Sequence, residues 1–216
     1  MSRRYSLTAM STDTVTTFLA LLAVVALVVV VVAAFTALFA LVRGSTPRWA
    51  LEARSAVAPV ALPLAAAVAL TCTLGSLYLS EVAKFPPCVL CWYQRIAMYP
   101  LVVILTVASL RRDRQVKWYV VPLALIGIGF SIYHYLIERF PDTVSFSCSE
   151  DVPCSTVWVW KFHFLSIPAM AGLGFALIIT LVLLAGSSGP EGPSGTGAGA
   201  RDDQPLDTDD LQEIPA

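Results

Sequence analysis

Five long segments of the chain carry almost no charge and consist mainly of Val, Leu, Ile, Ala and Phe. About 20 apolar residues cross the hydrocarbon core of a bilayer as a helix, and a spanning segment must satisfy its own backbone hydrogen bonds. A chain that is 57% hydrophobic and 13% charged is not a soluble globular domain. We therefore predict an all-α integral membrane protein with five transmembrane helices, approximately at residues 15–42, 55–80, 96–110, 118–137 and 164–185.

Two of these segments have unusual lengths. The third is the shortest, and it reaches full length if it extends back to Trp92 with Arg95 near the membrane surface, where an arginine side chain extends its charge into water. The first follows Arg3 and Arg4, as the apolar part of a secretory signal does, but it is about twice as long. We predict an additional N-terminal transmembrane helix rather than a cleaved signal.

The orientation of the helices follows from the short loop between the third and fourth segments, which contains Arg111, Arg112, Arg114 and Lys117. Short loops rich in Lys and Arg stay in the cytoplasm. By alternation, the two loops that contain paired cysteines lie outside the cytoplasm, and the C-terminal tail lies inside. We predict a multi-pass protein of the cell membrane (inner or plasma membrane), whose cysteine loops are extracytoplasmic and meet an oxidising compartment.

The chain divides into three predicted regions. Residues 1–54 contain the extra helix and a basic cytoplasmic loop, and residues 55–185 contain a four-helix membrane bundle. Beyond residue 185 the composition changes to Gly, Ser and Pro and then to Asp and Glu, which bury too little apolar surface to fold. Residues 186–216 are therefore predicted to form a disordered acidic tail. The sequence contains no phosphate-binding glycine loop and no basic stripe for nucleic acid.

The first cysteine pair precedes the third predicted span. Cys88 and Cys91 form a Cys-X-X-Cys motif after Pro86 and Pro87, which end any preceding helix and allow a new one to begin at the cysteines. A thiol in the first turn of a helix is ionised more easily, so we expect a reactive thiolate at Cys91. Arg95 follows one helical turn later on the same face and adds a permanent positive charge.

The second cysteine pair, Cys148 and Cys154, lies in the loop before the last span. A disulfide that closes a loop as short as Cys-X-X-Cys adds little stability, whereas two exchangeable pairs on one side of a membrane can pass electrons between them. The sequence therefore predicts a relay by thiol–disulfide exchange. The fifth cysteine, Cys72, lies in the middle of a span and is predicted to be an inert buried thiol.

Several longer motifs extend this pattern. They are the run Phe85-Pro-Pro-Cys-Val-Leu-Cys-Trp-Tyr-Gln-Arg-Ile-Ala-Met-Tyr-Pro100, the segment Tyr133-His-Tyr-Leu136, the Cys148 and Cys154 loop, and Phe164-Leu-Ser-Ile-Pro168. Together they resemble the bacterial disulfide bond formation protein B family (DsbB/BdbC type) over about residues 62–184. The resemblance implies a membrane thiol-disulfide oxidoreductase that reoxidises an extracytoplasmic thioredoxin-fold (DsbA-like) thiol oxidase. Such proteins pass the electrons to a membrane quinone, menaquinone or ubiquinone, and so support disulfide bond formation in exported proteins.

The same resemblance implies roles for individual residues. Cys88 and Cys91 would form the redox-active disulfide near the quinone, with Cys91 as the thiol that contacts it. Arg95 and His134 would lie at the quinone. Cys148 and Cys154 would form the second redox-active disulfide, with Cys148 attacked by the partner protein and Cys154 as its resolving cysteine. No metal ligand is implied.

Other interpretations compete with this one. A vitamin K epoxide reductase-like quinone reductase has the same parts in the opposite order, with the loop cysteines first. Four cysteines on one side could instead hold a metal ion in a four-thiolate site, although a spacing of five residues between two cysteines is poor for zinc. A scaffold held by two disulfides leaves the Cys-X-X-Cys motif without a purpose. The aromatic residues at the span ends fit either a membrane-surface belt or the wall of a pocket: Trp92, Tyr93, Trp158 and Trp160.

Overall fold

The computed structural model describes residues 2–141 and 153–186, with side chains described from Thr12 onward. Within these residues the chain is helical except for turns, connecting segments and one isolated bridge between Lys161 and Leu165. The helices are α1 (Ser2–Arg43), α2 (Arg48–Val57), α3 (Ala61–Leu77), α4 (Val89–Arg111), α5 (Lys117–Arg139) and α6 (Ile167–Ala185). A π-helical turn, Tyr78–Val82, extends α3, and a short 3-10 turn, Arg114–Val116, precedes α5.

Five of the helices are long and apolar enough to cross a membrane, namely α1, α3, α4, α5 and α6. The predicted all-α fold is confirmed, and so is the extension of the third span past Arg95, because α4 begins at Val89. The second span begins at Ala61 rather than near residue 55. Pro59 lies in a turn that separates the short helix α2 from α3, since proline cannot continue a helix that precedes it.

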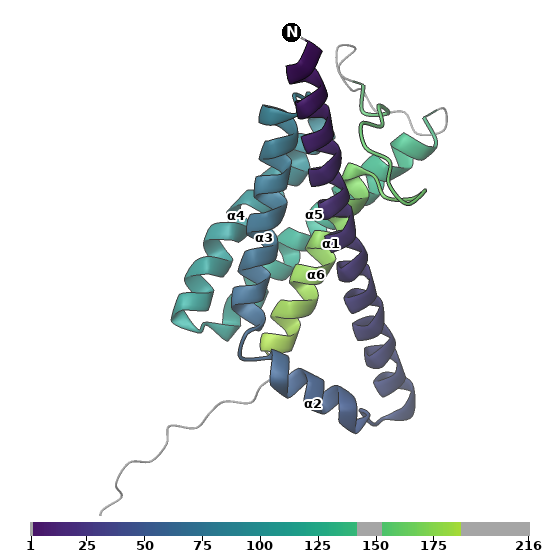
Figure 1. The fold of residues 1–216 in the computed structure, drawn as a ribbon. Coiled ribbons are helices and arrows are strands. Elements are labelled where there is room, and N and C mark those ends of the chain that lie inside the picture. The colour runs from purple at the N-terminus through teal and green to yellow at the C-terminus, as the bar shows by residue number, and fades with distance from the viewer. Residues whose placement is uncertain (1, 142–152, 187–216) are drawn as a thin grey trace, which may run out of the picture.

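Four helices form a bundle in which each contacts two neighbours (Figure 1). Helix α3 packs against α4 and α6, and α5 packs against the same two helices. Small residues allow this close approach, as they do in many membrane proteins. Ala61, Ala65 and Ala69 of α3 are fully buried, and a Cβ at Gly127 of α5 would overlap the ring of Phe175 in α6. Helix α1 lies outside this bundle and contacts α6.

The outward faces of the helices are apolar. Large side chains such as Leu21, Val103, Ile126 and Leu183 are at least 45% exposed. In water such a surface would be unfavourable, but lipid chains solvate it well. Together with the five long apolar helices, these faces describe a multi-pass membrane protein.

The two ends of the bundle differ in chemistry. One end contains Cys88 before α4, the end of α5, and the segment 153–166 that leads into α6. Asp13 of α1 forms an ion pair with Lys161 at this end. The opposite end contains α2 and the basic connection between α4 and α5. The predicted acidic tail and Cys148 lie outside the described residues.

Candidate active site

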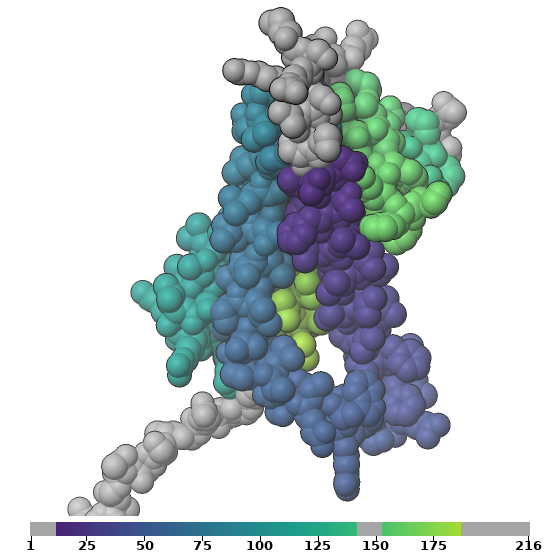
Figure 2. Space-filling model, in the orientation of Figure 1, coloured from purple at the N-terminus to yellow at the C-terminus, as the bar shows by residue number. Residues whose placement is uncertain are grey.

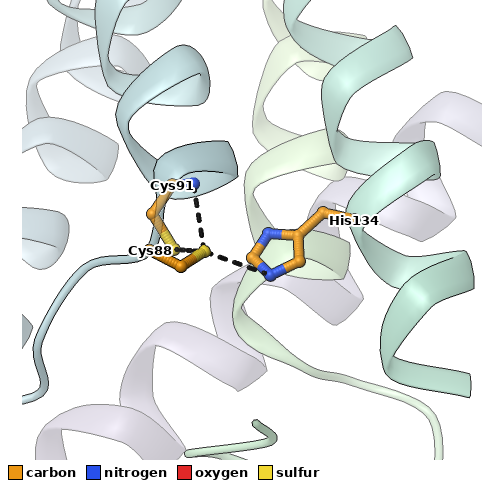
Figure 3. A group of neighbouring side chains, drawn as sticks. All are labelled: Cys88, Cys91 and His134. Atoms are coloured by element: carbon orange, nitrogen blue, oxygen red, sulfur yellow. Dashed lines mark hydrogen bonds between the residues drawn. The ribbon is translucent and has the colours of Figure 1, made fainter. Parts of the chain in front are cut away.

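The first turn of α4 brings the two thiols of the Cys-X-X-Cys motif together (Figure 3). Cys88 is the N-cap residue, with an extended backbone, and α4 begins directly after it. Its sulfur accepts a hydrogen bond from the backbone N–H of Cys91 at 3.4 Å and lies 3.3 Å from the sulfur of Cys91. Both are free thiols in this structure. The predicted helix start at the cysteines is thus confirmed, and a sulfur takes the place of a capping oxygen.

His134 of α5 approaches the same sulfur from the other side (Figure 3). Its Nε2 atom lies 3.6 Å from the sulfur of Cys88, and its Nδ1 atom lies 3.4 Å from the amide nitrogen of Gln94. An amide nitrogen can only donate, so Nδ1 of His134 accepts and a ring proton is on Nε2. His134 therefore directs an N–H toward Cys88. It is 3% exposed, so water does not compete for this contact.

These contacts favour a charged sulfur at Cys88. The hydrogen bond from the Cys91 side chain, followed by the hydrogen bond of His134, lowers the pKa of Cys88 to about 4, although burial acts in the opposite direction. The sequence indicated a thiolate at Cys91. In the structure, the backbone N–H of the first turn and His134 both point to Cys88 instead.

Cys154 packs beside Cys88 at the end of the bundle. The two residues share a buried cluster with Leu90 and Ile137. They also line a small pocket together with His134 and the carboxyl side chain of Glu138. Cys154 is disulfide-bonded, and Cys148, its predicted partner, lies outside the described residues. Two aromatic contacts hold the segment around Cys154 in place: Trp158 stacks on Phe85, and Trp160 lies over Arg139.

A second, larger cavity of about 340 Å³ also borders Cys91. Cys91 and Arg95 line it, whereas Cys88 does not. Arg95 is 9% exposed and is held by Ser76 of α3, to which its Nε donates at 2.9 Å and its Nη2 at 3.0 Å. The ring of Trp92 lies 5.2 Å from its guanidinium carbon. A cation fixed in this way on an apolar cavity can bind an electronegative group there.

Tyr99 supplies another polar group to the large cavity. Its side chain lines the cavity, and its hydroxyl oxygen is buried with no hydrogen-bond partner among the described residues. A buried hydroxyl without a partner costs free energy, which a ligand with an acceptor atom would restore. Trp158 also lines the cavity, as one of the two interpretations of the flanking aromatic residues predicted.

The structure thus gathers four predicted site residues in one place: Cys88, Cys91, Arg95 and His134. Cys72, predicted to be inert, is a free thiol on the wall of the large cavity. The sequence patterns did not mark Gln94, Ser76, Tyr99 or Glu138 as residues of the site. Helical spacing could have identified two of them, since Tyr99 follows Arg95 by four residues and Glu138 follows His134 by four. Ser76 belongs to another helix, so only the fold reveals it.

The cluster of Cys88, Cys91 and His134 could also hold a metal ion. Their ligand atoms lie within 4.8 Å of one another. Two sulfurs and one imidazole are a set that zinc accepts. The alternative site of four thiolates would need a thiolate from Cys154, which is disulfide-bonded in this structure.

Paired thiols at the end of a membrane helix bundle, next to a disulfide-bonded cysteine, define the class of membrane thiol-disulfide oxidoreductases. Comparison with known families gives the same class of protein and identifies one family within it. Residues 58–185 match the family "Disulfide bond formation protein DsbB", so the chain belongs to the DsbB family of membrane disulfide-forming proteins. Helices α1 and α2 precede the matched residues.

Several relatives support this assignment. The chain is 50% identical over 118 residues to "Disulfide bond formation protein C" of Bacillus subtilis, which covers 54% of this chain and 86% of the relative. It is 43% identical over 117 residues to "Probable disulfide formation protein C 2" of Bacillus cereus, a match that covers 54% of this chain and 84% of the relative. A "Probable disulfide formation protein" of Oceanobacillus iheyensis is 46% identical over 114 residues, with 51% and 77% covered. No solved structure gives a significant match.

Proposed function

We propose that this protein oxidises an extracytoplasmic thioredoxin-fold thiol oxidase and passes the electrons to a membrane quinone. The observation that carries the proposal is the position of the Cys-X-X-Cys pair between two spaces. Both cysteines line the small pocket with Cys154, but only Cys91 also lines the large apolar cavity with Arg95. One pair can therefore exchange disulfides on one side and reduce a lipid-soluble acceptor on the other.

The exchange proceeds through four cysteines. A thiolate of the reduced partner attacks Cys148, forms a mixed disulfide and releases Cys154 as a thiolate. Cys154 then attacks Cys88, which forms a Cys88–Cys154 disulfide and releases the thiolate of Cys91. The second thiol of the partner displaces Cys148, and Cys148 attacks Cys154 and releases Cys88. The partner is left with a disulfide, and the electron pair is left on Cys88 and Cys91.

The low pKa of Cys88 supports this order of events. A thiol with a low pKa is a good leaving group, so Cys88 departs readily when Cys148 attacks the Cys88–Cys154 disulfide. His134 stabilises the charge on the departing sulfur through its Nε2 atom. Cys88 and Cys91 then close to a disulfide as the electron pair leaves through Cys91.

The lining of the large cavity fits a quinone in its chemistry. Arg95 presents a cation held by Ser76, and the hydroxyl of Tyr99 is a donor without a partner among the described residues. A quinone carbonyl oxygen accepts such hydrogen bonds. Once bound, a quinone accepts two electrons and two protons and is released as a quinol. The remaining walls are largely apolar, as a membrane-soluble ligand requires.

Anaerobic quinone reduction tests this function. Purified protein receives a reduced thioredoxin-fold dithiol and menaquinone, and quinol formation and dithiol loss are followed together. We expect one quinol for each dithiol oxidised, and complete loss of quinol formation in Cys91→Ser. Zinc is measured in the same preparation. A stoichiometric zinc content with no quinol formed would support the metal site of Cys88, Cys91 and His134 and refute the relay.

A further inference from the structure

We infer that α1 forms the lipid-facing wall of the large cavity and selects the quinone by its isoprenoid tail. This inference rests on the proposed function. Helix α1 precedes the residues that match the family, so the four matched helices contain the cysteine site without it. Its position suggests what this added helix contributes.

Helix α1 is attached to the bundle on both sides of the cavity. Leu19 packs on α3 at Gly75, where a Cβ would lie only 3.1 Å from the leucine. Ala20 and Ala23 are 0% and 6% exposed and form a cluster with Leu165 and with residues of α6 that include Met170. Small residues permit this close contact. The ion pair of Asp13 with Lys161 adds a third attachment, at the end where the cysteines lie.

Between these attachments, α1 supplies part of the cavity wall. The wall includes Leu19, Leu22, Ala23, Val25 and Ala26 of this helix. At about 1.5 Å per residue, these positions extend roughly 10 Å along α1. On the facing helix α3, the lining continues from Leu64 to Ser80, which is roughly 24 Å by the same measure. The lining therefore follows most of the apolar span Ala61–Val82.

The chemistry of the wall changes along this length. Near Cys91 it includes the polar side chains of Ser76, Gln94 and Arg95. Farther along α3 it consists of residues such as Leu64, Ala67 and Val68, and the hydroxyl of Thr71 donates to Ala67 of its own helix. A polar end beside the thiols and a long apolar remainder match a quinone head with a hydrocarbon tail. The continuity with Cys91 favours this occupant over the acyl chain of a phospholipid.

The second half of α1 separates from the bundle. Figure 2 shows α1 against its neighbours in its first half, and farther along it shows α6 between α1 and α3. Figure 1 shows the same divergence toward α2. A ligand that moves within the membrane plane can enter through this separation, pass along α1 and place its head at Cys91.

Two neighbouring leucines of α1 provide a matched test. Leu22 lines the cavity and is 40% exposed, whereas Leu21 does not line it and is 51% exposed. The full-length variants Leu22→Trp and Leu21→Trp are assayed with menaquinone and with menadione, which has the same head and no tail. We expect Leu22→Trp to raise the apparent KM for menaquinone on the order of tenfold and to leave that for menadione unchanged. Leu21→Trp should change neither value.

A second cavity-lining variant tests the same role in case Leu22→Trp does not fold. Val25→Trp also changes a cavity-lining residue, but this side chain is 60% exposed, so the indole displaces little packing. Val25→Trp should also raise the apparent KM for menaquinone and leave that for menadione unchanged. The same apparent KM for menaquinone in the Leu21 and Leu22 variants would refute the role of α1. An equal rise in the apparent KM for menaquinone and for menadione would refute it as well. If the wild-type protein reduces neither quinone, the proposed function fails as well.

Discussion

Cys88 is the residue on which most of the local contacts converge. It caps α4, accepts the N–H of Cys91 and lies 3.6 Å from Nε2 of His134. Each contact stabilises negative charge on its sulfur, so the reduced pair carries its thiolate here. An ordinary cysteine, with a pKa near 9, is largely protonated at neutral pH.

This difference predicts a pH profile. Because the pKa of Cys88 is about 4, the thiolate is fully formed at neutral pH and is lost only as the pH falls through that value. We expect the rate of Cys88 alkylation by iodoacetamide in the reduced protein to stay level between about pH 6 and about pH 8. Mass spectrometry of the Cys88 peptide measures this rate. In His134→Ala the transition should move to higher pH, since the hydrogen bond of His134 to the Cys88 sulfur is lost.

An ordinary thiol would behave differently. Its alkylation rate would rise about tenfold per pH unit over the same range, because the thiolate fraction rises at that rate below the pKa. Such a profile in the wild-type protein would contradict the arrangement around Cys88. If the alkylation rate were independent of pH at Cys91 and rose with pH at Cys88, the thiolate would lie at Cys91, as the sequence predicted.

The sequence predicted residues of this site only where a local pattern marked them. Cys88, Cys91 and Arg95 lie within one motif, and His134 followed from the family resemblance. Gln94 and Ser76 could not be assigned, since Gln94 acts through His134 of α5 and Ser76 binds Arg95 from α3. Such contacts depend on how helices pack, which local spacing does not determine.

At the scale of the helices, apolar length was the reliable signal. All five predicted spans occur, because a segment in lipid must be helical and must have a minimum length. The ends of two spans differ from the predicted ones. Residues 55–57 belong to α2, and residues 164–166 precede α6, whose first turn contains Pro168. Apolar composition continues through these ends, so only prolines and local packing set them.

The helices also imply an orientation that labelling can test. We propose that the connection after α4 is cytoplasmic and that the cysteine end is extracytoplasmic, because Arg111, Arg112 and Arg114 gather at one end. In a background without native cysteines, Lys84→Cys should react with a membrane-impermeant thiol reagent in intact cells. Arg111→Cys should react only after the cells are opened. The reverse pattern would place the thiols in the reducing cytosol, where an oxidase role is untenable.

In the whole molecule, one cysteine pair borders the places of two proposed reactions, disulfide exchange with Cys154 and reduction of a quinone. The end of the bundle brings Cys88 and Cys154 into one cluster, and the interior cavity extends from Cys91 between α1, α3, α4 and α6. The sequence predicted the relay and its four cysteines, and the family resemblance implied that Cys91 is the thiol that contacts the quinone. The spaces around the two cysteines depend on the direction of the first turn of α4 and on the segment that carries Cys154, and only Cys91 reaches the large cavity.

Disulfide mapping tests this division most directly. Each single variant is incubated with the oxidised thioredoxin-fold partner, and its disulfides are identified by peptide mass spectrometry. In Cys91→Ser, the account predicts a Cys88–Cys154 disulfide as the main product, because these residues pack together. In Cys88→Ser, it predicts less of a Cys91–Cys154 disulfide, because Cys91 is only partly buried beside that cluster and also lines the large cavity. A Cys91–Cys154 disulfide that forms as readily as Cys88–Cys154 would contradict the account.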